Sequence, residues 1–433
     1  MPHYDGPMLI PPTSPPEAAA VPAWESEQYG VDSTYAWFRL LISLVVMTIG
    51  NAGMWVIPVV LPVVQAEFQI GRADAALPYT LMMIGFGLGG VLMGRLSDRF
   101  GLFRPLLGAS FAIGAGFVLA ALSHTILGFA LAHGLLIGLV GCAVTFAPLM
   151  ADTALWFARR RGVAVAICAS GNYLAGAVWP PVMEHFIATQ GWRSTYIAVG
   201  IFCTLGMASL ALLMRRRAPA QAATSSPSAQ SGDRDMPFGL RPNTATAALC
   251  LAGLSCCVAM AMPQVHIVAY CTDLGFGAAR GAQMLSIMLA CGIVSRLVSG
   301  ALSDRIGGMR TLVLGSALQC TALLLFLPFD GLVPLYIVSA MFGLFQGGIV
   351  PSYALVVREN FSAQQIGMRV GTVIMFTMLG MALGGWMSGK VFDLTGSYHA
   401  AFINGVAWNL LNLAIAVTLL LRLQQKKSES DPN

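Results

Sequence analysis

Long uninterrupted apolar stretches dominate the sequence of 433 residues, and about twelve of them reach the ~18 residues typical of a membrane span. Only 10% of the residues are charged, against about 25% in a soluble domain. Inside hydrocarbon each span must bond its own backbone, and continuous rather than alternating apolar runs favour helices over a barrel. The predicted spans lie at 38–64, 75–96, 104–123, 126–151, 163–187, 194–214, 246–270, 279–302, 310–328, 333–357, 368–391 and 400–421.

One sequence motif occurs twice, as Gly94-Arg-Leu-Ser-Asp-Arg-Phe-Gly101 and as Gly300-Ala-Leu-Ser-Asp-Arg-Ile-Gly307. The copies lie 206 residues apart (304 − 98), and each closes the second span of a set of six. The sequence therefore predicts an all-α membrane protein with twelve transmembrane helices in two pseudo-symmetric six-helix bundles. The expected parts are a disordered leader at 1–36, bundles at 37–214 and 244–422, a linker at 215–243 and a tail at 423–433.

The basic residues predict the orientation, because the loops of a membrane protein that face the cytoplasm are enriched in Lys and Arg. If both termini are cytoplasmic, four basic residues lie outside: Arg72, Arg193, Arg280 and Lys390. Nineteen lie inside: Arg39, Arg95, Arg99, Arg104, Arg159, Arg160, Arg161, Arg215, Arg216, Arg217, Arg234, Arg241, Arg305, Arg310, Arg358, Arg369, Arg422, Lys426 and Lys427. We therefore expect cytoplasmic termini and a multi-pass protein of the plasma membrane, in a bacterium the inner membrane.

Other classes of function find little support. The basic residues are dispersed among short loops, which disfavours nucleic acid as a partner, and no nucleophile–base pair suggests an enzyme. The nine cysteines lie within or beside apolar spans and lack metal-ligand spacing, so we expect neither disulfides, a metal nor a cofactor. Residues 1–36 lack the basic and apolar segments of a signal peptide. We expect a monomer in the lipid bilayer.

The doubled motif resembles the loop signature of the major facilitator superfamily, and the resemblance covers the whole membrane portion. It implies two six-helix halves with substrate held near the midplane between them. A second resemblance is to the monocarboxylate transporter family, in Trp156-Phe-Ala-Arg-Arg-Arg and the small residues up to Gly171, in Arg296 followed by Gly300, and in Phe392-Asp-Leu-Thr-Gly-Ser-Tyr398. It implies alternating-access transport of a small organic monocarboxylate, with a proton as the candidate co-substrate.

The sequence departs from that family at two acidic positions. The first-span segment Gly50-Asn-Ala-Gly-Met-Trp55 has no acid, and Gly292 stands where the family has an acid four residues before the arginine. These departures bear on proton coupling more than on carboxylate binding. Facilitated diffusion and anion exchange therefore remain alternatives to symport.

Arg296 is the basic residue that lies deepest in a predicted span. An arginine at the centre of a membrane helix costs about 2.5–3.5 kcal/mol on insertion scales, so its presence calls for a function. A guanidinium offers two parallel donors that match the two oxygens of a carboxylate. We predict that Arg296 binds the substrate carboxylate; the alternative is a structural arginine bonded to backbone carbonyls.

Polar and aromatic residues at mid-depth are candidates to line the same cavity, with helix packing as the alternative role for each. They are Asn51, Trp55, Asn172, Tyr173, Gln346 and Tyr353, of which Tyr173 and Tyr353 occupy roughly facing positions in the two halves. His266, in the outer part of the seventh span, is the candidate proton carrier because histidine titrates near neutral pH.

A second group of charges lies at the inner ends of the spans. The superfamily resemblance implies that Asp98 meets the start of helix eleven and Arg99 meets Asp152. By symmetry Asp304 meets the start of helix five and Arg305 meets Glu359. These pairs would close a cytoplasmic gate, whose predicted residues are Asp98, Arg99, Asp152, Arg160, Asp304, Arg305, Glu359 and Arg369.

Two further functions remain possible. A dicarboxylate would need a second cation, for which Lys390 is the candidate, as in an organic-anion exchanger of the oxalate/formate type. A membrane sensor built on a transporter fold is the other, although the intact gate motifs in both halves disfavour it.

Overall fold

A computed structural model of the protein describes residues 30–216, 236–362 and 365–430, so the predicted leader and linker lie largely outside the described residues. The described residues are helical and contain no strand. Within these described ranges, twelve helical segments are long and apolar enough to cross a membrane, which confirms the predicted spans. The last helix runs to Ser430 and so covers most of the expected tail.

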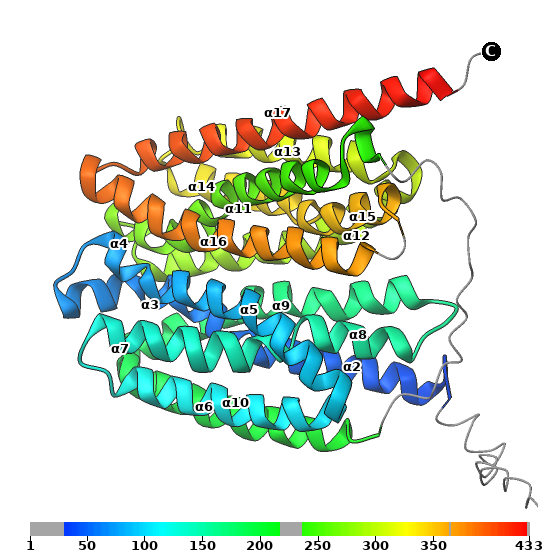
Figure 1. Ribbon diagram of the computed structural model, residues 1–433. Helices are drawn as coiled ribbons and strands as arrows, with labels where there is room; N and C mark the ends of the chain where they lie inside the picture. The colour runs from blue at the N-terminus through cyan, green and yellow to red at the C-terminus, as the bar shows by residue number, and fades with distance from the viewer. Residues whose placement is uncertain (1–29, 217–235, 363–364, 431–433) are drawn as a thin grey trace, which may run out of the picture.

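The helices divide into two halves that lie side by side, drawn blue to green and green to red in Figure 1. The N half consists of α2 (Thr34–Gly50), α3 (Ala52–Phe68), α4 (Arg72–Ala75), α5 (Leu77–Phe100), α6 (Phe103–Ala121), α7 (Ile126–Leu131), η1 (Ala132–Cys142), α8 (Ala147–Leu155), α9 (Arg161–Gln190) and α10 (Trp192–Leu213). The C half consists of η2 (Pro237–Gly239), α11 (Pro242–Asp273), α12 (Ala278–Ile306), α13 (Gly308–Leu325), α14 (Leu332–Gln346), α15 (Ile349–Asn360), α16 (Ile366–Thr395) and α17 (Tyr398–Ser430).

The two ends of the bundle differ. Both repeated motifs lie at the end where α17 finishes, which we call the motif end; α4 lies at the other end, which we call the α4 end (Figure 1). At the α4 end, α4 packs against α16 of the other half. At the motif end, the described residues form no hydrogen bond or ion pair between the halves.

Apart from the short α4 that precedes α5 in the second span, three of the twelve spans in the described residues are interrupted. The first breaks at Asn51 (φ −90°, ψ 8°), and the fourth breaks at Phe146 (φ −111°, ψ −90°) after the π-helical segment η1. The tenth breaks at Gly347 and Gly348, between α14 and α15. Breaks of this kind are tolerated at membrane depth where the backbone is buried in protein or lines a cavity.

Glycines let the helices beside these breaks approach closely. A Cβ added at Gly85 would collide with the Gly134 carbonyl oxygen in η1, and one at Gly343 would collide with the Met288 carbonyl oxygen in α12. Small residues at such crossings bring helix backbones into van der Waals contact, which is how membrane helices associate.

Candidate functional site

Arg296 lies on α12 where the two halves meet. Its Nη1 donates to the Ala169 carbonyl oxygen of α9 at 2.9 Å, and its Nε donates to the Gly347 carbonyl oxygen at 3.5 Å. The Gly347 carbonyl needs such a donor because Pro351, four residues later, has no N–H to offer it. The guanidinium carbon lies 4.4 Å from the centroid of the Tyr173 ring, also on α9.

The guanidinium keeps free donors. Of its five N–H groups two are used in these bonds, which leaves three (5 − 2) on Nη1 and Nη2. None of the ion pairs among the described residues involves Arg296. Arg296 is therefore both a backbone anchor and a charge without a carboxylate partner.

Gly292, one turn before Arg296, touches the same tyrosine. A Cβ added at Gly292 would lie 2.6 Å from Cε1 and 2.7 Å from Cδ1 of Tyr173. Real Cβ atoms almost never approach so closely, so the Tyr173 ring fills the space that a side chain at 292 would need.

Three other predicted residues form one network in the N half. Asn172 donates from Nδ2 to Asn51 Oδ1 at 3.2 Å, and Trp55 Nε1 donates to the Asn172 carbonyl oxygen at 3.0 Å. Asn51 Nδ2 also donates to the Met47 carbonyl oxygen at 2.8 Å, next to the bond that this oxygen accepts from the Asn51 backbone amide at 3.1 Å. The structure thus joins Asn51, Trp55 and Asn172, next in sequence to Tyr173.

The remaining two lining candidates lie apart from this network. Gln346 is fully buried and accepts at Oε1 from Gln264 Nε2 at 3.0 Å, while its own Nε2 has no partner. The Tyr353 hydroxyl donates to Asn412 Oδ1 at 2.6 Å on α17. Tyr353 is thus engaged inside the C half, whereas Tyr173 lies against Arg296 between the halves.

His266 lies in another part of the molecule from Arg296. It is fully buried, its Nε2 lies 2.8 Å from the Gly385 carbonyl oxygen, and its Nδ1 has no partner. The hydrogen bond to a carbonyl requires Nε2 to carry the proton, so Nδ1 is the unpaired acceptor. Its ring centroid lies 5.9 Å from that of Tyr398, beside the α4 end.

Sequence reasoning missed a polar cluster at the α4 end. Arg72 of the N half donates to Asp273 at 3.0 and 3.1 Å and to the Tyr398 hydroxyl at 2.7 Å, both in the C half. The Asp393 carboxylate accepts from the backbone amides of Arg72 and Ala73 at 2.7 and 2.9 Å. The sequence places Arg72 only in an outer loop, although its partners Asp393 and Tyr398 belong to the Phe392–Tyr398 motif.

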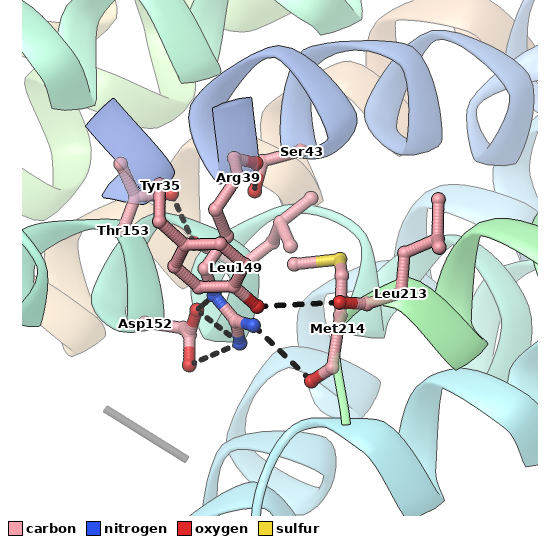
Figure 2. A network of polar contacts seen from close by, with 8 residues as sticks. All are labelled: Tyr35, Arg39, Ser43, Leu149, Asp152, Thr153, Leu213 and Met214. Carbon is pink, nitrogen blue, oxygen red and sulfur yellow. Dashed lines mark hydrogen bonds and ion pairs between the residues drawn. The ribbon is translucent and has the colours of Figure 1, made fainter. Parts of the chain in front are cut away.

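At the motif end, Asp152 pairs with Arg39 rather than with Arg99 (Figure 2). Arg39 donates from Nε and Nη2 to the two Asp152 oxygens at 3.0 and 3.2 Å, and from Nη1 to the Met214 carbonyl oxygen at 3.2 Å. Asp98 and Arg99 are exposed and form no ion pair with another described residue. The implied contact between Arg99 and Asp152 is therefore absent from this conformation.

The other predicted gate residues also contact only their own half. Glu359 accepts from the Gly308 amide with both oxygens at 3.1 Å, where the N-terminus of α13 attracts a carboxylate, so it does not pair with Arg305. Arg369 is buried and bonds neutral acceptors, among them Gln365 and Asn243. Exposed residues complete the set: Arg160, Asp304 and Arg305.

Comparison with known proteins places these features in context. A family model described as the Major Facilitator Superfamily matches residues 40–335 and 310–433. Monocarboxylate transporter 13 from Bos taurus is 29% identical over 75% of each chain. The protein of that name from Rattus norvegicus is 28% identical over 82% of this chain and 81% of its own. The MFS transporter asaE of Aspergillus flavus is 23% identical over 73% of this chain and 71% of its own.

A solved structure shares the fold. It is an inward-facing, unoccupied bacterial homolog of the human lysosomal transporter Spinster, with a TM-score of 0.66 and 14% identity over 90% of this chain and 95% of that one.

Proposed function

This chain belongs to the Major Facilitator Superfamily and is a membrane transporter, and we propose that it moves a small organic monocarboxylate by alternating access. The observation that carries the proposal is the Arg296 guanidinium, which has three donors and no carboxylate partner. One unmatched positive charge suits a monoanion. Two parallel N–H groups suit the two oxygens of a carboxylate.

The neighbouring residues would fix the arginine and contact the rest of the substrate. Tyr173 holds the guanidinium from one face. Asn172, whose amide nitrogen bonds Asn51 and Met54, would contact the substrate through its amide oxygen. Asn51 and Trp55 bond Asn172, so we assign them to positioning it. Gln346 retains one unbonded amide nitrogen, whereas the Tyr353 hydroxyl is already bonded to Asn412.

In this proposal the conformation described here is the inward-facing one, with the motif end in the cytoplasm. The halves are bonded through Arg72 at the α4 end, while Asp98, Arg99, Asp304 and Arg305 are exposed. When the motif end closes, these residues would form the gate with Asp152, Arg160, Glu359 and Arg369. The assignment implies a plasma-membrane protein with cytoplasmic termini.

An exchanger of the oxalate/formate type, acting on a dicarboxylate, is less well supported. Its second cation would be Lys390, which is exposed near the end of α16 that contacts α4. Coupling to a proton through His266 would have to act over the distance between the α4 end and Arg296. Whether an acid neutralises Arg296 is therefore a more direct indicator of proton coupling than His266 is.

Uptake by proteoliposomes tests the proposal. Labelled acetate, lactate, pyruvate and benzoate would be offered to the wild type and to Arg296→Ala. We expect uptake of at least one anion, and a loss of about 100-fold or more in Arg296→Ala, because a charge-assisted hydrogen bond contributes about 1.5–3 kcal/mol and two are removed.

The matched control is Arg280→Ala, which removes an exposed arginine from the same helix and should leave uptake unchanged. Unchanged uptake in a well-folded Arg296→Ala would refute the site. Absence of uptake of all four anions by the wild type would refute the substrate class.

A further inference from the structure

The residues around Arg296 decide whether its positive charge is neutralised when no substrate is bound. Gly292 and Arg296 are four residues apart and so lie on one face of α12. A carboxylate at 292 would reach the guanidinium, but the Tyr173 ring occupies that space at 2.6 Å from the position of a Cβ. Gly292 and Tyr173 are therefore complementary: the absence of a side chain on one helix admits the ring from the other.

The aromatic ring does not replace the missing charge. An aromatic face attracts a cation but carries no net charge, so the guanidinium stays positive. The next acid along α12 is Asp304, eight residues and roughly 12 Å away along the axis. Asp152 and Asp273 are paired with Arg39 and Arg72. No ion pair among the described residues brings an acid to Arg296.

The site consequently differs by one charge between its two occupancies. When empty it carries one unmatched positive charge, and when it holds a monoanion it is neutral. Between the inward- and outward-facing states the site must pass through a closed form that excludes water. The cost of an arginine at mid-membrane predicts that the empty form makes this passage roughly 70- to 400-fold more slowly than the loaded form.

From this difference we infer that the protein is an obligatory exchanger, which returns across the membrane only with a second monoanion bound. The inference rests on the proposed carboxylate transport and specifies its mode. One monoanion leaves for each that enters, so the cycle moves no net charge and requires no proton. Tyr173 is the positioning residue that packs on the guanidinium and fills the space left by Gly292.

The first test compares efflux under two conditions. Proteoliposomes loaded with the labelled anion that the wild type takes up would be diluted into potassium sulfate, or into sulfate with the same anion unlabelled. We expect efflux to be at least about 70-fold faster with the external anion. An acid-outside gradient should not drive uptake into vesicles without internal anion. Fast efflux into sulfate alone, or gradient-driven uptake into empty vesicles, would overturn the inference.

The second test changes one charge. Gly292→Asp with Tyr173→Ala makes room for a carboxylate beside Arg296, and Gly292→Asn with Tyr173→Ala has the same shape without the charge. We expect the ratio of exchange to net efflux to fall at least tenfold in the Asp variant and to stay high in the Asn variant. Equal ratios in two active variants would show that the acid at 292 does not set the mode.

The outcomes separate this inference from the proposed function. Rapid net efflux of a carboxylate would overturn exchange and leave carboxylate transport intact. Absence of any carboxylate flux, even with anion on both sides, would overturn the proposed function and the inference with it. The second test measures the ratio of exchange to net efflux, so a variant with reduced activity still shows whether exchange is obligatory. If both variants fail to fold, the efflux of the wild type alone answers that question.

Discussion

At the level of single residues, two buried or half-buried arginines have different partners. Arg39 is neutralised by Asp152, and the two side chains are only 3% and 13% exposed. Arg296 bonds two carbonyl oxygens and faces Tyr173 without any acid. A paired arginine holds helices together, whereas an unpaired one is available to a ligand.

The Arg39–Asp152 pair yields a prediction about stability. Arg39→Ala should destabilise the protein by about 3–5 kcal/mol, because it leaves the Asp152 carboxylate buried without its partner. Thermal unfolding in detergent measures the change. Arg99→Ala, which removes an exposed arginine, should change stability by less than about 0.5 kcal/mol.

A double substitution checks the cause. Arg39→Met with Asp152→Leu removes both charges and should recover most of the loss, since apolar pairs often replace buried ion pairs without cost. A double variant as unstable as Arg39→Ala would contradict this account and point to the contact of Arg39 with Met214 instead.

The sequence identified some of these residues and misassigned others, for physical reasons. Arg296 stood out because the cost of a charge depends on its depth in a span, which the sequence reveals. The sequence does not reveal the partner of Asp152, because that partner depends on which helix ends meet in a given conformation. The sequence shows that Gly292 stands where the family has an acid. Only the packing of α9 on α12 shows that the Tyr173 ring occupies the space of a side chain at 292.

At the level of helices, the prolines create hydrogen-bond acceptors for neighbouring helices. Pro181 has no N–H for the Ala177 carbonyl, and Ser286 of α12 donates to that oxygen across the two halves. Pro351 leaves the Gly347 carbonyl to Arg296 in the same way. Helix α12 thus donates to two acceptors that a helix without proline would have satisfied itself, one on α9 and one between α14 and α15.

A double-mutant cycle tests this role of Pro181. Ser286→Ala should destabilise the protein by about 0.6 kcal/mol, the average for a hydrogen bond between membrane helices. In a Pro181→Ala background the new N–H bonds the Ala177 carbonyl, so Ser286→Ala should cost less. Thermal unfolding of the four proteins gives the coupling.

Ser209→Ala is the matched control, because its hydroxyl bonds only the Leu205 carbonyl oxygen of its own helix. Its cost should be independent of Pro181. An equal cost of Ser286→Ala in both backgrounds would show that Pro181 does not free this acceptor.

The sequence predicted the twelve spans but not their interruptions. Apolar runs predict which segments lie in hydrocarbon. They do not predict where the helical hydrogen bonds within a segment are interrupted. Asn51 and Gly347-Gly348 were the available signals for two of the breaks. The π-helical segment η1, which packs closely against α5, had no signal of comparable strength.

At the level of the whole molecule, the bonds between the halves are concentrated at one end. Arg72 donates to Asp273 and Tyr398, and its amide is bonded by Asp393, whereas the described residues of the motif end form no bond between halves. One side chain of the N half therefore supplies much of the polar contact that holds this end closed.

Removing that side chain should shift the balance of conformations. Arg72→Gln should increase the population with a closed motif end at least tenfold, since it weakens charge-assisted bonds worth about 1.5–3 kcal/mol each. Spin labels at Phe100→Cys and Met368→Cys, exposed positions in opposite halves, would report a shorter distance. Eight of the nine native cysteines are buried, so they should label poorly.

Arg280→Gln is the control and should leave the distance distribution unchanged. A distribution that Arg72→Gln does not alter would mean that apolar contacts between α4 and α16 hold the end closed without it.

The duplication also bears on how the specificity of such a protein evolves. Counting back 206 residues from Arg296 gives Gly90 (296 − 206), its counterpart in the N half. Gly89 is pressed against the Leu139 carbonyl oxygen, but a Cβ added at Gly90 would meet nothing within 4 Å. A glycine codon becomes an arginine codon by one base change. The duplication therefore leaves room for a side chain at the position equivalent to Arg296. We predict that Gly90→Arg adds a second cation and gains uptake of labelled oxalate, which the wild type would lack.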